Sequence, residues 1–200
     1  MNLPDSRIAC DAAINSLQVA SHKAALRSEM LAARRALTTL QRNDAEEKIQ
    51  SHVIHWVTTR AIQTLAVYSP IRSEPDLMAA WSTMSAAGIA LALPVVVASD
   101  APLRFVAWQP GEPMACDAFG VAVPALPHRH VTPDAIAVPC LGITPQRFRL
   151  GYGGGFYDRT LALLRAVPAI GITFDCNKTD FEAQAHDIAL QVVITESGLF

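Results

Sequence analysis

Three features are scarce in this chain, and each scarcity excludes a class of protein. Cysteines are few and far apart: Cys10, Cys116, Cys140 and Cys176. They form no C-x-x-C pair and have no histidine cluster beside them, so neither a zinc site nor a disulfide scaffold is indicated. No apolar run reaches the length of a membrane span. The formal net charge is only -2, which gives no reason to expect nucleic-acid or membrane-surface binding.

The length and composition predict one domain. Two hundred residues with 51% hydrophobic content are enough for a single well-buried core. Residues 1–20 lack clear periodicity and are expected to form a flexible N-terminal extension, with one α/β domain over residues 21–200. Asp5, Arg7 and Asp11 interrupt the stretch where a secretory signal would need an apolar core. We expect a monomeric, cytoplasmic protein.

Apolar periodicity alternates between helical and strand spacing along the chain. Helices are predicted over residues 21–37, 40–57, 75–87 and 156–167, and strands over 64–68, 89–97, 103–108, 134–139, 169–174 and 190–195. The proline-rich stretch 109–133 is expected to be a long irregular connection. This alternation predicts a three-layer α/β/α domain with a Rossmann-like, mostly parallel sheet and helices on both faces.

The most informative segment is residues 149–159, which read RLGYGGGFYDR. Four of the ten glycines fall within five positions, directly before a helix-like run. The backbone N–H groups of such a loop can converge on one anion, and a helix N-terminus behind them adds positive charge. The spacing fits neither a P-loop nor a dinucleotide fingerprint. On the loop alone, a glycine-rich surface turn remains the alternative.

Charged residues around this loop suggest what it binds. Arg149 can hold two phosphate oxygens at once, and Asp158 offers a hard oxygen ligand to Mg²⁺. Lys23 and Arg27 stand four apart on the first predicted helix, so both cations project from one face. Each has a structural alternative: a solvated helix surface for the cations, and a first-turn carboxylate for Asp158. Together they predict a nucleotide-phosphate site.

Residues 149–159 resemble the signature R-L-G-Y-G-G-G-Y-Y-D-R of the 5-formyltetrahydrofolate cyclo-ligase family, with Phe156 where tyrosine is usual. Lys23 and Arg27 match an early K-x-x-x-R pair of the family, and residues 68–74 resemble its strand-to-loop segment ending in a pocket glutamate. Residues 103–108 resemble M-x-F-x-x-W. The chain departs from the family at residues 75–77, which lack a usual threonine, and at 143–147, which lack F-D-x-x-G.

The resemblance implies the following roles. Arg149, Lys23 and Arg27 would be catalytic. ATP would contact Lys23, Arg27, Arg149, Leu150, Gly151, Tyr152, Gly153, Gly154, Gly155, Phe156 and Tyr157. The folate would contact Ser69, Glu74, Trp108, Tyr152, Gly153, Gly154, Gly155 and Phe156. Asp158 and Asp187 would hold Mg²⁺, although a His186-Asp187 pair is more often a turn or a structural hydrogen bond.

The implied reaction is the ATP- and Mg²⁺-dependent closure of 5-formyltetrahydrofolate (folinic acid) to 5,10-methenyltetrahydrofolate, through phosphorylation of the formyl oxygen and attack by N10. No protein nucleophile is needed, and the sequence has no convincing Ser-His-Asp or Cys-His arrangement. Two alternatives stay open: a non-catalytic regulator that binds folate or nucleotide on the same scaffold, and an ATP-dependent ligase for a related substrate.

Overall fold

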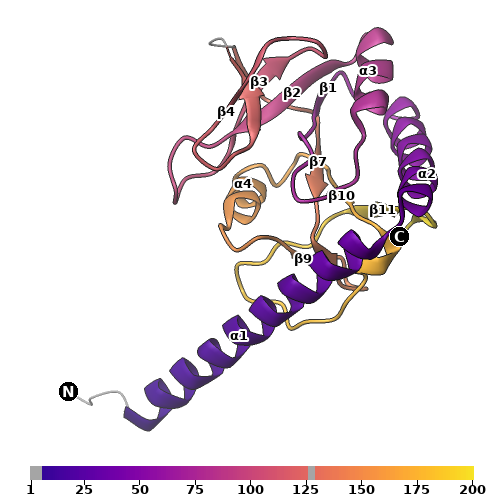
Figure 1. Cartoon of the computed structure of the whole chain (residues 1–200). Helices are drawn as coiled ribbons and strands as arrows, with labels where there is room; N and C mark the ends of the chain where they lie inside the picture. The colour runs from indigo at the N-terminus through magenta and orange to yellow at the C-terminus, as the bar shows by residue number, and fades with distance from the viewer. Residues whose placement is uncertain (1–5, 126–128) are drawn as a thin grey trace.

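The structure is a computed structural model. It describes the backbone of residues 6–125 and 129–200, and the side chains of residues 19–125 and 129–200. The strands of the main sheet are β1 (Thr64–Ala66), β2 (Ala90–Val95), β3 (Arg104–Trp108), β6 (His130–Val131), β7 (Ala135–Pro139), β10 (Ala169–Ile172), β11 (Val192–Thr195) and β12 (Gly198–Leu199). Their order is β12-β11-β10-β7-β1-β2-β3-β6, and the sheet runs through the middle of the molecule (Figure 1).

The sheet is parallel at its centre and antiparallel at its edges. Strands β11, β10, β7, β1 and β2 pair in parallel, whereas β12 pairs antiparallel with β11, β3 with β2, and β6 with β3. Both faces of β7 and β10 are buried, which explains why these strands are continuous apolar runs in the sequence. The predicted α/β class with a mostly parallel sheet is confirmed.

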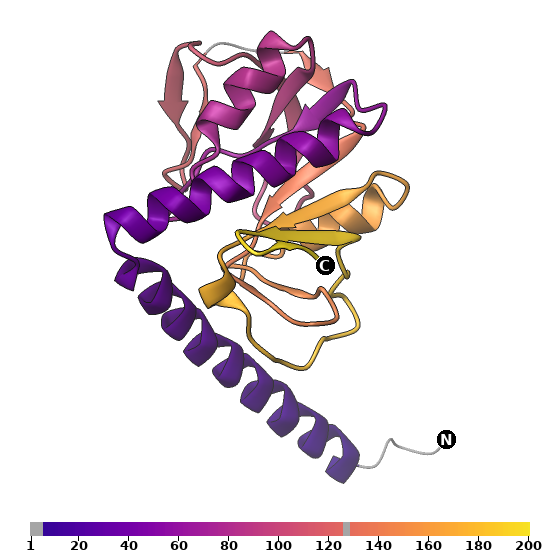
Figure 2. The ribbon, with the colours of Figure 1, turned by 90° about the vertical axis from the view of Figure 1, so that its right-hand side faces the viewer.

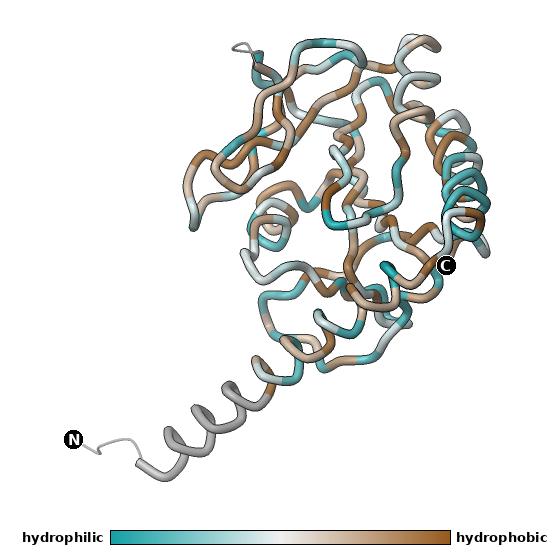
Figure 3. The backbone as a smooth tube through the Cα atoms, in the orientation of Figure 1, coloured by the Kyte–Doolittle hydropathy of each residue, from teal (hydrophilic) through white to brown (hydrophobic). Residues whose placement is uncertain are grey.

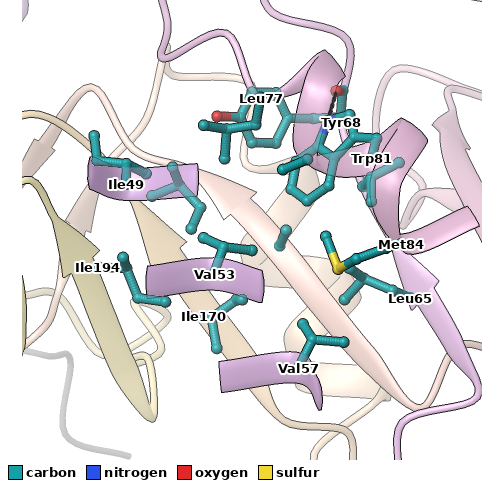
Figure 4. Packing of buried hydrophobic residues seen from close by; sticks show 14 of the residues in the cluster. Ile49, Val53, Val57, Leu65, Tyr68, Leu77, Trp81, Met84, Ile170 and Ile194 are labelled. Atoms are coloured by element: carbon teal, nitrogen blue, oxygen red, sulfur yellow. Dashed lines mark hydrogen bonds between the residues drawn. The ribbon is translucent and has the colours of Figure 1, made fainter. Parts of the chain in front are cut away.

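Helices cover both faces of the sheet. They are α1 (Ser6–Ala36), α2 (Thr39–Thr58), α3 (Met78–Ala86) and α4 (Phe156–Leu163), with a 3-10 turn, η1 (Asp175–Asn177). On one face, Ile49, Val53 and Val57 of α2 recur at helical spacing and point at the strands (Figure 4). On the other face, Leu161 of α4 packs against Phe105 and strands β7, β10 and β11. None of the helices in the described residues has the length and apolar character needed to cross a bilayer.

Helix α1 lies apart from the two sheet-covering layers. It turns sharply into α2, where Thr38 and Gln41 form a reciprocal cap, and its second half runs beside the loops of the last third of the chain (Figure 2). Leu26 and Met30 pack there on Leu141 and Leu150. Leu141 directly precedes β8 (Gly142–Ile143), and Leu150 belongs to β9 (Arg149–Leu150). These two short strands form an antiparallel pair. Hydropathy along the tube also shows the mixed character of α2, which carries polar residues on its outer side (Figure 3).

Two predictions about elements were wrong. The first helix begins at Ser6 instead of residue 21. Residues 1–5 lie outside the described residues, and that the extension over residues 1–20 is flexible stays a prediction. The stretch 109–133 is not irregular throughout, because it holds a hairpin of β4 (Met114–Cys116) and β5 (Ala122–Pro124). The Asp117 carboxylate accepts the N–H groups of Phe119 and Val121 and so closes the turn.

Candidate functional site

The glycine run links β9 to α4, and two of its glycines need a backbone that other residues avoid. Gly153 and Gly155 have φ of 99° and 66°. Gly155 is also the N-cap of α4. A Cβ on Gly155 would stand 2.7 Å from Arg159 Nη1, and one on Gly154 would stand 2.8 Å from the Phe156 ring. The loop is therefore shaped by the absence of side chains.

Arg149 enters this loop with an unused donor. Its side chain is 4% exposed, and Nη2 lies 2.7 Å from Asp158 Oδ1 in the first turn of α4. Nη1 is buried and has no hydrogen-bond partner among the described residues. A buried cationic donor of this kind requires an acceptor. A phosphate oxygen beside the glycine run would supply it.

Arg159 has a different task. It donates to the carbonyl oxygens of Ser99, Ala101 and Gly154, which ties the β2–β3 loop to the glycine run. Its guanidinium also lies 5.1 Å from the centre of the Phe156 ring. Since these contacts already occupy Arg159, Arg149 is the better candidate for an anion.

Helix α1 contacts the glycine run through Arg27. Arg27 Nε donates to the Gly151 carbonyl at 2.8 Å, and its guanidinium covers Gly153. Lys23 lies 2.7 Å from Asp187 Oδ2. The two cations thus share one helix face, as predicted, but each contacts a different segment. Burial would raise the pKa of Asp187, yet the Gln184 amide and the Lys23 ammonium hold that pKa below its usual value.

Glu74 is a buried carboxylate in a tight loop after β1. The loop has left-handed φ at Arg72 and Ser73, and Glu74 Oε2 accepts the Ile71 N–H at 2.9 Å. Burial raises the pKa of Glu74 to about 7, against the lowering effect of the Ile71 N–H and the Arg34 charge. The carboxyl therefore titrates in the neutral range. Ser69, at the start of the loop, is half-buried.

Tyr152 of the glycine run connects Glu74 to Arg34 of helix α1, a residue outside the predicted site. The Tyr152 hydroxyl donates to Glu74 Oε1 at 3.1 Å, and it accepts from Arg34 Nη1 at 3.3 Å. Arg72 stacks over the Tyr152 ring at 4.7 Å. The available signal for Arg34 was its position four residues after Met30, on the buried stripe of α1. A cation at a core position implies a buried partner.

The profile of the 5-formyltetrahydrofolate cyclo-ligase family matches residues 19–196. The chain belongs to this family. A cyclo-ligase of Mycolicibacterium smegmatis is 32% identical over 185 residues, covering 86% of this chain and 93% of the relative. One of Mycoplasma pneumoniae is 29% identical, covering 87% and 98%. The resemblance that the glycine run carried is confirmed.

Solved structures agree with the cyclo-ligase assignment. A 5,10-methenyltetrahydrofolate synthetase of Mycoplasma pneumoniae superposes with a TM-score of 0.73 at 27% identity, covering 87% of this chain and 98% of that one. The synthetase of Aquifex aeolicus gives 0.74 at 27% identity, covering 88% and 91%. The fold is shared over nearly the whole chain.

The predicted metal ligands, Asp158 and Asp187, are not gathered into one cluster. Asp158 and Asp187 each face a cation, and the described residues hold no cluster of three or more histidine, cysteine or acidic side chains. Mg²⁺ needs only one or two carboxylates when phosphate oxygens complete its shell, so these residues fit the ion together with a nucleotide.

Trp108 is not brought to the other predicted site residues. It pairs with Leu91 at the amino end of β2, whereas Glu74 lies in the loop after the carboxyl end of β1 and bonds to Tyr152 of the glycine run. There it is 4% exposed within the main core and borders a separate hollow of about 380 Å³. An aromatic residue in an apolar strand can equally be a core residue, and Trp108 occupies a core position.

Proposed function

We propose that this chain catalyses the ATP-dependent cyclisation of 5-formyltetrahydrofolate to 5,10-methenyltetrahydrofolate, with release of ADP and phosphate. The observation that carries the proposal is the buried, unpaired Nη1 of Arg149 beside the glycine run. The glycine run beside it can bind a polyphosphate through its backbone N–H groups, and the Arg27 guanidinium lies against Gly153 of this run. The names of the relatives supply the folate half.

The chemistry follows from the poor reactivity of an amide-like formyl group. Its oxygen attacks the γ-phosphorus of ATP, and the bond from that phosphorus to the ADP oxygen breaks. N10 then attacks the activated formyl carbon and loses its proton. The carbon–oxygen bond breaks, phosphate leaves, and the five-membered ring is closed. Both steps occur between substrates, so the protein has to position them and neutralise charge.

The residues of this chain divide that work by position. Arg149, Lys23, Arg27 and the amides of the glycine run hold the phosphates. Glu74, Ser69, Tyr152 and Phe156 receive the folate. Mg²⁺ held by Asp158 and Asp187 would neutralise phosphate charge. When the nucleotide enters, Arg149 can keep Asp158 on Nη2 while its free Nη1 donates to a phosphate oxygen.

The reaction is tested by absorbance. Purified protein is mixed with 5-formyltetrahydrofolate, Mg²⁺ and ATP, with ATP omitted as the control. We expect the methenyl chromophore to appear only with ATP. If the protein binds the folate and forms no chromophore, it is a regulator and the proposal is wrong. Folate-independent release of ADP, with turnover of a related substrate, would identify a different ligase.

Replacing Arg149 by alanine should abolish turnover while the fold persists. The variant loses the phosphate ligand and leaves Asp158 without its cation, and we expect kcat/KM to fall by about 10²-fold or more. The matched control is Arg165→Ala, since Arg165 is exposed and its one hydrogen bond to the described residues goes to the nearby Ala162 carbonyl. Circular dichroism reports the fold of both. Normal turnover in a folded Arg149→Ala protein would refute the role of Arg149.

A further inference from the structure

Arg34 is a fully buried cation that the proposed chemistry does not use. Its exposed fraction is 0%, and its three hydrogen bonds go to neutral groups. Nε donates to Asn177 Oδ1 at 3.2 Å, Nη2 to the Cys140 carbonyl at 2.6 Å, and Nη1 to the Tyr152 hydroxyl. A buried charge without a direct counter-ion is costly, so its retention demands a reason.

The Tyr152 hydroxyl has only one arrangement between its two neighbours. A guanidinium can only donate, so the hydroxyl oxygen must accept from Arg34. The single hydroxyl hydrogen is then left to point at Glu74 Oε1. Asn177 holds the guanidinium in place from the other side, because its Nδ2 is anchored on the Met30 carbonyl at 2.9 Å. The chain Asn177–Arg34–Tyr152–Glu74 is therefore directional.

We propose that Arg34 is a positioning residue: through the Tyr152 hydroxyl it keeps the Glu74 carboxylate ionised and oriented toward the pterin ring of the folate. This inference rests on the proposed function, since it assumes that Glu74 receives the pterin. The edge of a pterin presents N–H donors, and an ionised carboxylate accepts such donors with both oxygens. A neutral carboxyl would turn a donor of its own toward them.

The electrostatics around Glu74 support this role. Burial raises its pKa to about 7, while the Ile71 N–H, the Arg34 charge, the Tyr152 hydroxyl and the Arg72 charge lower it. Loss of Arg34 or of the hydroxyl removes a lowering influence, so Glu74 would keep its proton to higher pH. The charged and titratable groups that interact with Glu74 from the surrounding elements are Arg34, Tyr68, Arg72, Cys140, Tyr152 and Tyr157.

The test is the pH dependence of 5-formyltetrahydrofolate affinity, measured without ATP from about pH 5.5 to 9. We expect wild-type affinity to fall as the pH drops through about 7. In Tyr152→Phe and Arg34→Lys, this midpoint should move up by about one pH unit. Tyr152→Phe removes the hydroxyl that bonds to Glu74, and lysine lacks the planar fork with which the guanidinium spans Asn177, the Cys140 carbonyl and Tyr152. The matched control is Arg35→Lys, at the exposed neighbouring position, whose midpoint should equal that of wild type.

The outcomes separate this inference from the proposed function. Unmoved midpoints in both folded variants overturn it, and so does a uniform loss of affinity at every pH, which indicates a merely structural Arg34. If Arg34→Lys does not fold, Tyr152→Phe decides alone. A wild-type protein that makes the methenyl product while the variants keep its pH profile refutes the inference only. A wild type that neither binds nor converts the folate refutes both.

Discussion

Single charged residues in this site are held in places that are unfavourable for an isolated charge. Glu74 illustrates the consequence for stability. Its pKa is about 7 in the folded protein, against an ordinary value of 4.5. Between these two values the folded state binds more protons than the unfolded state. The free energy of unfolding therefore decreases as the pH rises through this window, by about 3 kcal/mol in total.

Replacing Glu74 by glutamine should stabilise the protein at alkaline pH and weaken folate binding. Glutamine cannot ionise, so the variant avoids the unfavourable buried charge. We expect the two proteins to be similarly stable near pH 5 and the variant to lead by about 2–3 kcal/mol at pH 8. Urea unfolding at both pH values measures this. Glu47→Gln, at an exposed site on α2, is the control. A stability difference independent of pH would contradict the assignment.

Single residues also show where sequence reasoning about the site stops. The types and spacing of Arg149, Lys23 and Arg27 were enough to predict an anion site. The groups that these cations contact could not be predicted, because Lys23, for example, bonds to Asp187, 164 positions further along the sequence. Arg34 lies outside the predicted site residues. Its role depends on the contact with Tyr152, which exists only in the folded chain.

At the scale of elements, the glycine run can be tested by adding single methyl groups. Gly155→Ala should destabilise the protein by about 1–2 kcal/mol, because φ is 66° and the new Cβ would displace the Arg159 guanidinium. Gly151→Ala has open space around its Cβ and no left-handed φ, so its stability should stay within about 0.5 kcal/mol of wild type. Thermal unfolding compares the two. Equal effects would mean that the loop does not depend on the backbone of Gly155.

Buried elements were predictable and exposed ones were not. The strands of the parallel centre were found because burial on both faces requires continuous apolar residues. The β4–β5 hairpin was missed because β4 is exposed and β5 only half-buried, so neither has an apolar pattern. Pro94 does not end the predicted strand: β2 continues to Val95, since β1 already ends opposite Ala92 and no partner there needs the missing N–H.

At the scale of the whole molecule, the site depends on where helix α1 is cut. Deleting residues 1–18 should preserve turnover, because the family match begins at residue 19 and the deletion retains Lys23 with its bond to Asp187. Deleting residues 1–27 removes Lys23, Leu26 and Arg27 and should abolish turnover. The chromophore assay applied to both truncations measures this. Full activity in the longer deletion would show that α1 does not contribute to the nucleotide site.

The architecture as a whole was predictable, whereas the assembly of the site was only partly so. Alternating strands and helices determine a sheet whose carboxyl edge carries Glu74 and the glycine run. Trp108 was assigned to the same site from a local pattern, but β3 is antiparallel and ends at the opposite edge. Strand direction is a property of the pairing, and a local pattern does not contain it.

The contacts of helix α1 with the last third of the chain also affect the order in which the protein folds during synthesis. Lys23 and Arg27 leave the ribosome long before Asp187 and Gly151, which lie 164 and 124 positions further on. Until then the side of α1 that bears Leu26 and Met30 has no surface to cover it. A nascent chain can thus make its first sheet strands before Lys23 and Arg27 have the groups that they contact in the complete protein. The proposed nucleotide site is therefore complete only after the final segment of the chain has been made.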